Sequence, residues 1–161
     1  MTSRLTPTIA VLFVCVMHTV PARAQSALGL WEETPGPLVA QIQAGVEDYY
    51  SFDYNGALAR FDRVITAMPD HPVGYFLKAE AYWWLFLNDR QNSRARRELD
   101  RWLGEAISRG ERRLTANPDD VETLFILGSA YGRRGMLAGT ARDAWSAARD
   151  AQRAKGKLDR V

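Results

Sequence analysis

The chain has 161 residues, of which 47% are hydrophobic and 25% are charged, and its formal net charge is +2. This length allows one domain with a modest core, and the composition is ordinary for a soluble globular chain. One cysteine and two histidines leave little material for nucleophilic or metal chemistry.

Residues 1–24 have the pattern of a secretory signal peptide. Arg4 precedes an apolar run at 9–17, and the sequence PARA at 21–24 supplies the small residues that a signal peptidase recognises. We expect cleavage after Ala24 and an exported protein, periplasmic or secreted. The apolar run is about half of the ~20 residues needed to cross a bilayer, so a retained anchor is the weaker alternative. No transmembrane segment is expected after cleavage.

Cleavage would also change the chemistry of the chain. It removes Cys15, so neither a disulfide nor a thiolate metal site is available, and His71 becomes the only histidine. Val14 is not the small residue that a lipoprotein signal carries before its cysteine, so lipid attachment is not expected. We therefore predict no metal and no cofactor.

The charges of the mature chain are unevenly distributed. Residues 25–90 hold 4 basic and 9 acidic residues, whereas residues 91–161 hold 15 basic and 10 acidic residues. An export signal argues against nucleic acid as the target of the basic half. Two halves of opposite net charge favour end-to-end pairing of molecules or binding of an acidic partner. The alternative is that these charges lie on solvated helix faces and have no binding role.

The first elements follow a leader at 25–37, which is rich in turn-forming residues. A helix is predicted over 38–51, followed by a corner at 52–55 in which Asn55 is the candidate helix cap. The next helix has apolar residues at three- and four-residue steps and ends before Pro69. A third helix begins at Pro72, because proline suits the first turn of a helix.

Three further helices are predicted after a break at 87–93. Ser93 is the candidate cap of a long helix that reaches Ala116. A fifth helix begins at Asp119, which has capping-box spacing with Glu122, and ends at Gly135. Thr140 and Asp143 repeat this start signal for a sixth helix with a thin apolar stripe. No strand pattern is present, so the expected fold class is all-α with about six helices.

The same pattern occurs twice, in MPDHPVGYFLKAEAYWW at 68–84 and NPDDVETLFILGSAYGRRG at 117–135. Pro69 aligns with Pro118, Ala79 with Gly128, and Tyr82 with Tyr131. Such self-similarity indicates a helical repeat array. Over 38–161 the pattern resembles the tetratricopeptide repeat family, whose first helix carries a large, a small and an aromatic residue, as do Leu127, Gly128 and Tyr131. Ala57, Phe61 and Pro69 fit the second helix of that family.

Two features depart from the family. Gln41 and Asp48 occupy positions where large and aromatic residues are usual. The two prolines are 49 residues apart, whereas the family period is about 34 residues. The 15 extra residues would be worth ~22 Å of helix at ~1.5 Å each. They predict an elongated second helix and a longer loop, which share these residues.

The resemblance implies antiparallel helix pairs, three of them degenerate, stacked as a short right-handed α-solenoid. The first helices of such pairs line a concave groove. The implied ligand groove contains Tyr49, Tyr50, Phe76, Glu80, Trp83, Trp84, Phe125 and Arg133. The alternative is that Trp83 and Trp84 do not line this groove but pack as core under the elongated helix.

A basic cluster begins the long helix, at the end where a helix dipole disfavours cations. It suits a carboxylate-rich peptide or anionic head groups, and the alternative is a solvated face. Its members are Arg94, Arg96, Arg97 and Arg101.

The sequence therefore predicts a non-catalytic module that binds a protein or peptide, or serves as a scaffold, through an aromatic groove. The alternative is a self-assembly module that uses its oppositely charged halves and its last helix. That helix is a weak cap for an array, so either the array continues or this end docks on a partner or on a second copy. An enzymatic interpretation would depend on Asp70 with His71 or Asp119 with Asp120, and capping explains these aspartates.

Overall fold

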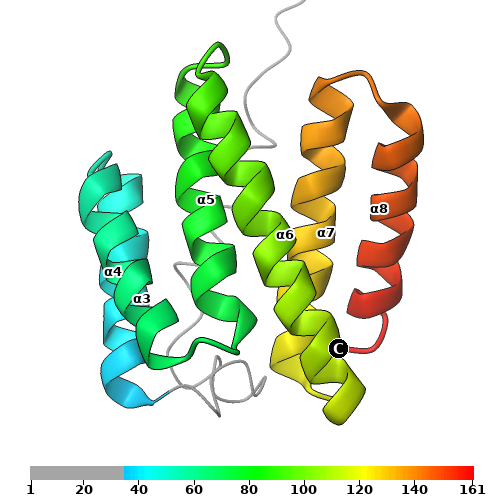
Figure 1. Cartoon of the computed structure of the whole chain (residues 1–161), viewed down its shortest axis with the longest axis horizontal. Helices are drawn as coiled ribbons and strands as arrows, with labels where there is room; N and C mark the ends of the chain where they lie inside the picture. The colour runs from blue at the N-terminus through cyan, green and yellow to red at the C-terminus, as the bar shows by residue number, and fades with distance from the viewer. Residues whose placement is uncertain (1–34) are drawn as a thin grey trace, which may run out of the picture.

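The computed structural model describes residues 35–161, which form six α-helices and no strand (Figure 1). This confirms the all-α fold class. The predicted signal peptide and most of the leader lie outside the described residues. The helices are α3 (Gly36–Tyr50), α4 (Tyr54–Ala67), α5 (Pro72–Asn88), α6 (Ser93–Ala116), α7 (Val121–Thr140) and α8 (Ala144–Leu158).

The helices pack in chain order. Each described helix contacts the next, and α5 also contacts α3 and α7, whereas the backbones of α4, α6 and α8 do not approach one another. The α3–α4, α5–α6 and α7–α8 loops lie at one end of the molecule, and α6 crosses in front of α5 and α7 (Figure 1). α5 and α7 are therefore the most enclosed helices.

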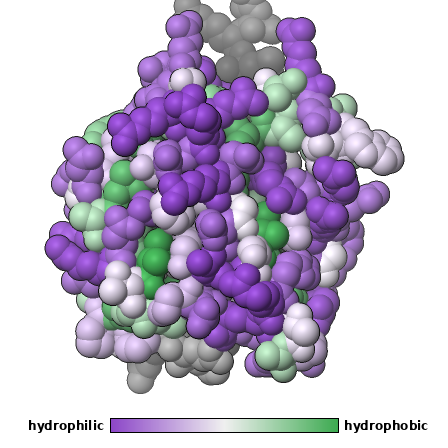
Figure 2. All heavy atoms as spheres, viewed as in Figure 1, coloured by the Kyte–Doolittle hydropathy of each residue, from purple (hydrophilic) through white to green (hydrophobic). Residues whose placement is uncertain are grey.

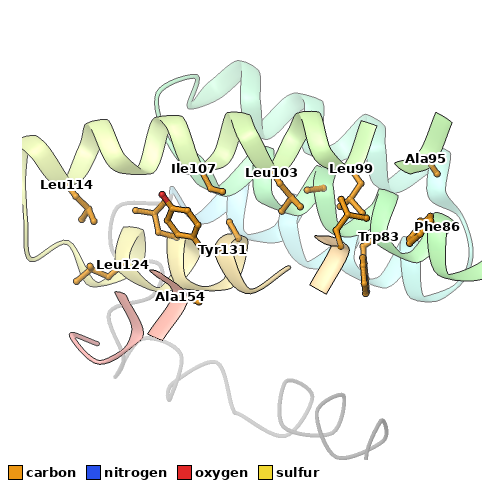
Figure 3. Close-up of a cluster of buried hydrophobic side chains, with 14 residues drawn as sticks. Trp83, Phe86, Ala95, Leu99, Leu103, Ile107, Leu114, Leu124, Tyr131 and Ala154 are labelled. Atoms are coloured by element: carbon orange, nitrogen blue, oxygen red, sulfur yellow. The ribbon is translucent and has the colours of Figure 1, made fainter. Parts of the chain in front are cut away.

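Two clusters of buried side chains form the core. One lies where α6 covers α5 and α7, and it contains Leu99, Leu103 and Leu127, each 0% exposed (Figure 3). The other joins α3, α4 and α5 around Phe61, with one contribution from α7. Phe76 packs against both clusters, so the core is continuous along the row of helices.

The long fourth helix of the prediction is confirmed. α6 has 24 residues, against 14 in α4 and 15 in α8. The prediction that the fifth helix ends at Gly135 was wrong, since α7 continues to Thr140. Gly135 instead allows α8 to approach, because a Cβ at this position would lie 3.2 Å from the carbonyl oxygen of Ala147.

The predicted helix caps were misplaced by one to three residues. In α4, α6, α7 and α8 the capping side-chain oxygen accepts a hydrogen bond from the backbone N–H three residues later. At each of these corners two residues that can cap a helix lie within three positions of each other, so composition alone does not select between them. The observed caps are Asp53, Asn92, Asp120 and Asp143, in place of the predicted Asn55, Ser93, Asp119 and Thr140.

Two glycines of α6 provide a matched test of the packing of α6 against α7. A Cβ at Gly110 would lie 2.6 Å from Cγ of the buried Leu127, whereas a Cβ at Gly104 meets nothing within 4 Å. We expect Gly104→Ala to raise the free energy of unfolding by ~0.5–1 kcal/mol through helix propensity. Gly110→Ala gains the same propensity but overpacks the core, which costs ~1–3 kcal/mol. Urea unfolding of both variants measures the difference, and equal stabilisation would contradict the α6–α7 contact.

Candidate functional site

The structure brings together three of the predicted aromatic groove residues, but they pack on one another. The ring of Trp84 in α5 lies 6.5 Å from that of Tyr49 and 5.4 Å from that of Tyr50, both in α3. Tyr49 is buried, and its burial raises the pKa of its hydroxyl far above the usual range. This aromatic contact therefore joins α3 to α5.

A second group of predicted groove residues joins α5 to α7. The Arg133 guanidinium donates hydrogen bonds of 2.6 and 2.5 Å to the two carboxylate oxygens of Glu80. It also lies 4.7 Å from the centre of the Trp83 ring. Glu80 is 8% exposed and Trp83 is 5% exposed. A bidentate arginine–carboxylate pair of this kind fixes the spacing of two helices.

These placements correct part of the predicted groove. Trp83 belongs to the cluster that α6 covers, as the alternative interpretation proposed, and Figure 3 shows it beside Leu99. Trp83, Glu80 and Tyr49 are buried, so they are not open groove surface. The sequence does not reveal this, because burial depends on where the extra length of α6 lies.

Four predicted aromatic residues remain half-buried on the odd-numbered helices, and we call them the odd-helix face. Phe76 and Phe125 occupy equivalent positions of the two repeats, 49 residues apart. Phe125 makes no ring contact with another aromatic residue among residues 35–161. These side chains therefore retain accessible apolar surface. The odd-helix face comprises Tyr50, Phe76, Trp84 and Phe125.

The polar residues at the two corners hold the helices in place. His71 caps α5, with Nδ1 accepting from Val73 N at 3.3 Å, and its Nε2 lies 3.7 Å from Glu122 Oε1. Asp120 accepts from Thr123 N at 2.9 Å and from Arg113 Nη2 at 2.9 Å. Burial opposes ionisation of Asp120, but these hydrogen bonds outweigh it and lower its pKa. Both residues thus have structural partners.

A cleft of about 380 Å³ lies between α6, α7 and α8, and only part of it was anticipated. Arg96 and Arg97 of the basic cluster line it. Arg94 and Arg101 do not, and Arg101 pairs with Glu98 at 3.5 Å. No local pattern predicts this cleft, because three segments distant in sequence form it. Its lining is completed by Asp100, Arg134, Leu137, Ala138, Ala141, Asp143, Ser146, Arg149 and Asp150.

One ion pair anchors the wall of the cleft. Arg134 donates to the two carboxylate oxygens of Asp150 at 2.7 and 2.9 Å, and the Asp150 side chain is 3% exposed. These hydrogen bonds raise the pKa of Arg134 and lower the pKa of Asp150. The pair joins α7 to α8, and the charge of Arg134 compensates that of Asp150.

Comparison of the chain with protein-family models, curated proteins and solved structures finds no match. Within residues 35–161, no helix is both long enough and apolar enough to cross a membrane.

The Asp150–Arg134 pair predicts a pH dependence of stability. The pKa of Asp150 is lower in the folded state than in the unfolded state. The stabilisation from its ionised carboxylate is therefore fully present above the pKa of the unfolded state, near 4. It is lost as the pH falls through the pKa of the folded state. At pH 7 we expect Asp150→Asn to lower the free energy of unfolding by ~1.5–3 kcal/mol. The difference from wild type should shrink below about pH 4, as measured by urea unfolding across pH.

The matched control is Asp159→Asn. Asp159, which directly follows α8, is an exposed partner of Lys155 in that helix, so this change should cost less than ~1 kcal/mol. A loss for Asp150→Asn that is equal at pH 7 and at pH 3 would contradict the role of the ionised pair.

Proposed function

We propose that this chain is an exported, non-catalytic binding or scaffold module built as a short tetratricopeptide-like α-solenoid of three helix pairs. One observation carries the proposal. Successive odd-numbered helices contact each other, α3 with α5 and α5 with α7, whereas the backbones of the even-numbered helices stay apart among the described residues. A row of helix pairs with this asymmetry curves with its odd-numbered helices inside. Contacts restricted to neighbours are typical of solenoids.

Repeated local contacts support this interpretation. Arg109 Nε donates to the carbonyl oxygen of Pro69 at 2.9 Å, and Arg160 Nη2 donates to that of Pro118 at 2.5 Å. In both cases an arginine of the following pair binds the proline that ends the preceding one. The chain thus repeats a tertiary contact as well as a sequence pattern.

Small residues at equivalent places support it further. A Cβ added to Gly45 would lie 2.6 Å from the ring of Phe61, and one added to Gly128 would lie 2.5 Å from Cγ of Leu158. Each glycine therefore allows the first helix of a pair to approach the second. This close approach is the role of the small residue in the resembled family.

The odd-helix face is the proposed ligand surface. Half-buried aromatic side chains offer apolar area at low conformational cost, and such residues often dominate binding energy. The opposite side, where α4, α6 and α8 face the viewer, is mostly hydrophilic (Figure 2). A protein or peptide segment with apolar side chains fits the odd-helix face better than a small polar molecule does. His71 and Asp120, on which an enzymatic interpretation would depend, cap α5 and α7.

Site-specific photo-cross-linking tests this surface. A photoreactive phenylalanine analogue at Phe125 should cross-link discrete partners in the exported fraction. The same analogue at Ala59, which is exposed on α4, should give none, because α4 lies on the outer side. Equal products at both positions, or none at Phe125, would reject the odd-helix face as the ligand surface.

Self-assembly is a second candidate, favoured by the charges of the two ends. Residues 35–71 hold 2 basic and 5 acidic residues, whereas residues 121–161 hold 8 basic and 4 acidic residues. Trp145, on the last helix, is 78% exposed. An acidic first pair and a basic last pair make a head-to-tail contact electrostatically favourable.

Light scattering of the mature protein distinguishes this candidate. Charge-driven association predicts a larger mass at low salt, which falls towards the monomer at high salt because the Debye length shortens. A monomer at both ionic strengths would exclude it.

A further inference from the structure

We propose that the cleft between α6, α7 and α8 is a second binding site, distinct from the odd-helix face, and that it receives an acidic peptide segment of a partner protein. Helix geometry creates this cleft. α6 and α8 flank α7, and Lys157 Nζ lies 3.0 Å from Glu111 Oε2, which ties them together at one end. Towards the hairpin-loop end the two helices diverge (Figure 1), and Leu137 and Ala138 of α7 line the space between them.

The cleft has unneutralised positive charge. Arg96, Arg97 and Arg149 form no ion pair with another residue of the described chain, although Arg149 Nη2 donates to Ser146 Oγ at 3.3 Å. The carboxylates of the cleft are mostly engaged. Asp150 binds Arg134 and lies 3.6 Å from Arg153.

Asp143 is also engaged, as the N-cap of α8. Asp100 is then the one lining carboxylate without a hydrogen bond or ion pair to residues 35–161. The charge of Arg149 acts on both Asp143 and Asp150, and helps to lower the pKa of each. The four arginines and three aspartates of the lining leave a net charge of +1, and Arg96 and Arg97 are the two arginines most available to bind an external anion.

The position of these arginines works against helix stability. Arg96 and Arg97 lie near the N-terminus of α6, whose first turn contains no acidic residue, and the N-terminus of α8 opens onto the same cleft. Both helix dipoles place positive potential there, so cations at this end are unfavourable and anions are favourable. Arg142, beside the cleft, has a φ of 60°, a conformation that most side-chain-bearing residues avoid. Folding stability alone does not account for so many cations here.

The lining favours a carboxylate-bearing peptide over a compact anion such as phosphate. Asp100, which also lines the cleft, repels a compact doubly charged anion more strongly than it repels a single carboxylate. Leu137, Ala138 and Ala141 provide an apolar strip for small side chains. Guanidinium groups bind carboxylates through paired N–H donors, which lysine does not reproduce. A volume of about 380 Å³ accommodates a few residues of an extended segment.

Fluorescence anisotropy tests the proposal with the mature protein. The probe is a labelled peptide that alternates glutamate and alanine, and its control replaces each glutamate with glutamine. We expect the acidic peptide to bind and the control not to bind. Arg96→Ala/Arg97→Ala should weaken binding by about tenfold, the loss expected from two partly exposed charge pairs. Arg112→Ala, which removes an exposed arginine of the same helix, should change it less than about twofold.

Several outcomes would overturn the proposal. They are no binding by the wild-type protein, equal binding by the double variant, or equal binding of the glutamine control. Displacement by inorganic phosphate at the ionic strength of a matched chloride control would assign the site to a compact anion instead. A wild-type self-association that the double variant abolishes would assign it to a second copy. Failed cross-linking at Phe125 leaves these results intact, since Phe125 does not line the cleft.

Discussion

The packing of α6 across both α5 and α7 is the contact on which the rest of the structure depends. Its side chains Leu99 and Leu103 are completely buried, and Gly110 lets Leu127 approach its backbone. Because α6 is longer than α4 and α8, it spans two helix pairs at once. It thereby buries Trp83 and places its own arginine-rich first turns beside the end of α7. The core and the cleft are consequences of the same helix.

Arginine pairs between helices set the remaining spacings. Arg133 and Arg134 are adjacent in sequence, but consecutive residues of a helix point in different directions. Arg133 therefore binds Glu80 of α5, and Arg134 binds Asp150 of α8. α7 is held from both sides by carboxylates that are largely buried. Removing one partner would leave an uncompensated charge, so these pairs specify helix positions more than they add net stability.

The two candidate surfaces differ in chemistry and in location. The odd-helix face offers half-buried aromatic rings, whereas the cleft offers guanidinium groups around a small apolar strip. If both proposals hold, the same small domain distinguishes a partner segment with apolar residues from one with carboxylates. Such a division is compatible with a scaffold that holds two segments, and neither surface requires a reactive group.

Local chemistry determined the helices of this protein. Apolar periodicity, Pro69 and Pro118 located the helices and corners, because these signals act within a few residues. The resemblance of 68–84 to 117–135 also indicated the elongated α6. Only the tertiary structure decided which of the aromatic and charged residues are accessible. Trp83 and Trp84 are adjacent, yet one lies under α6 and the other against α3. The cleft likewise exists only because α6 and α8 diverge over α7, and relative helix placement is set by the summed packing of residues far apart in the chain.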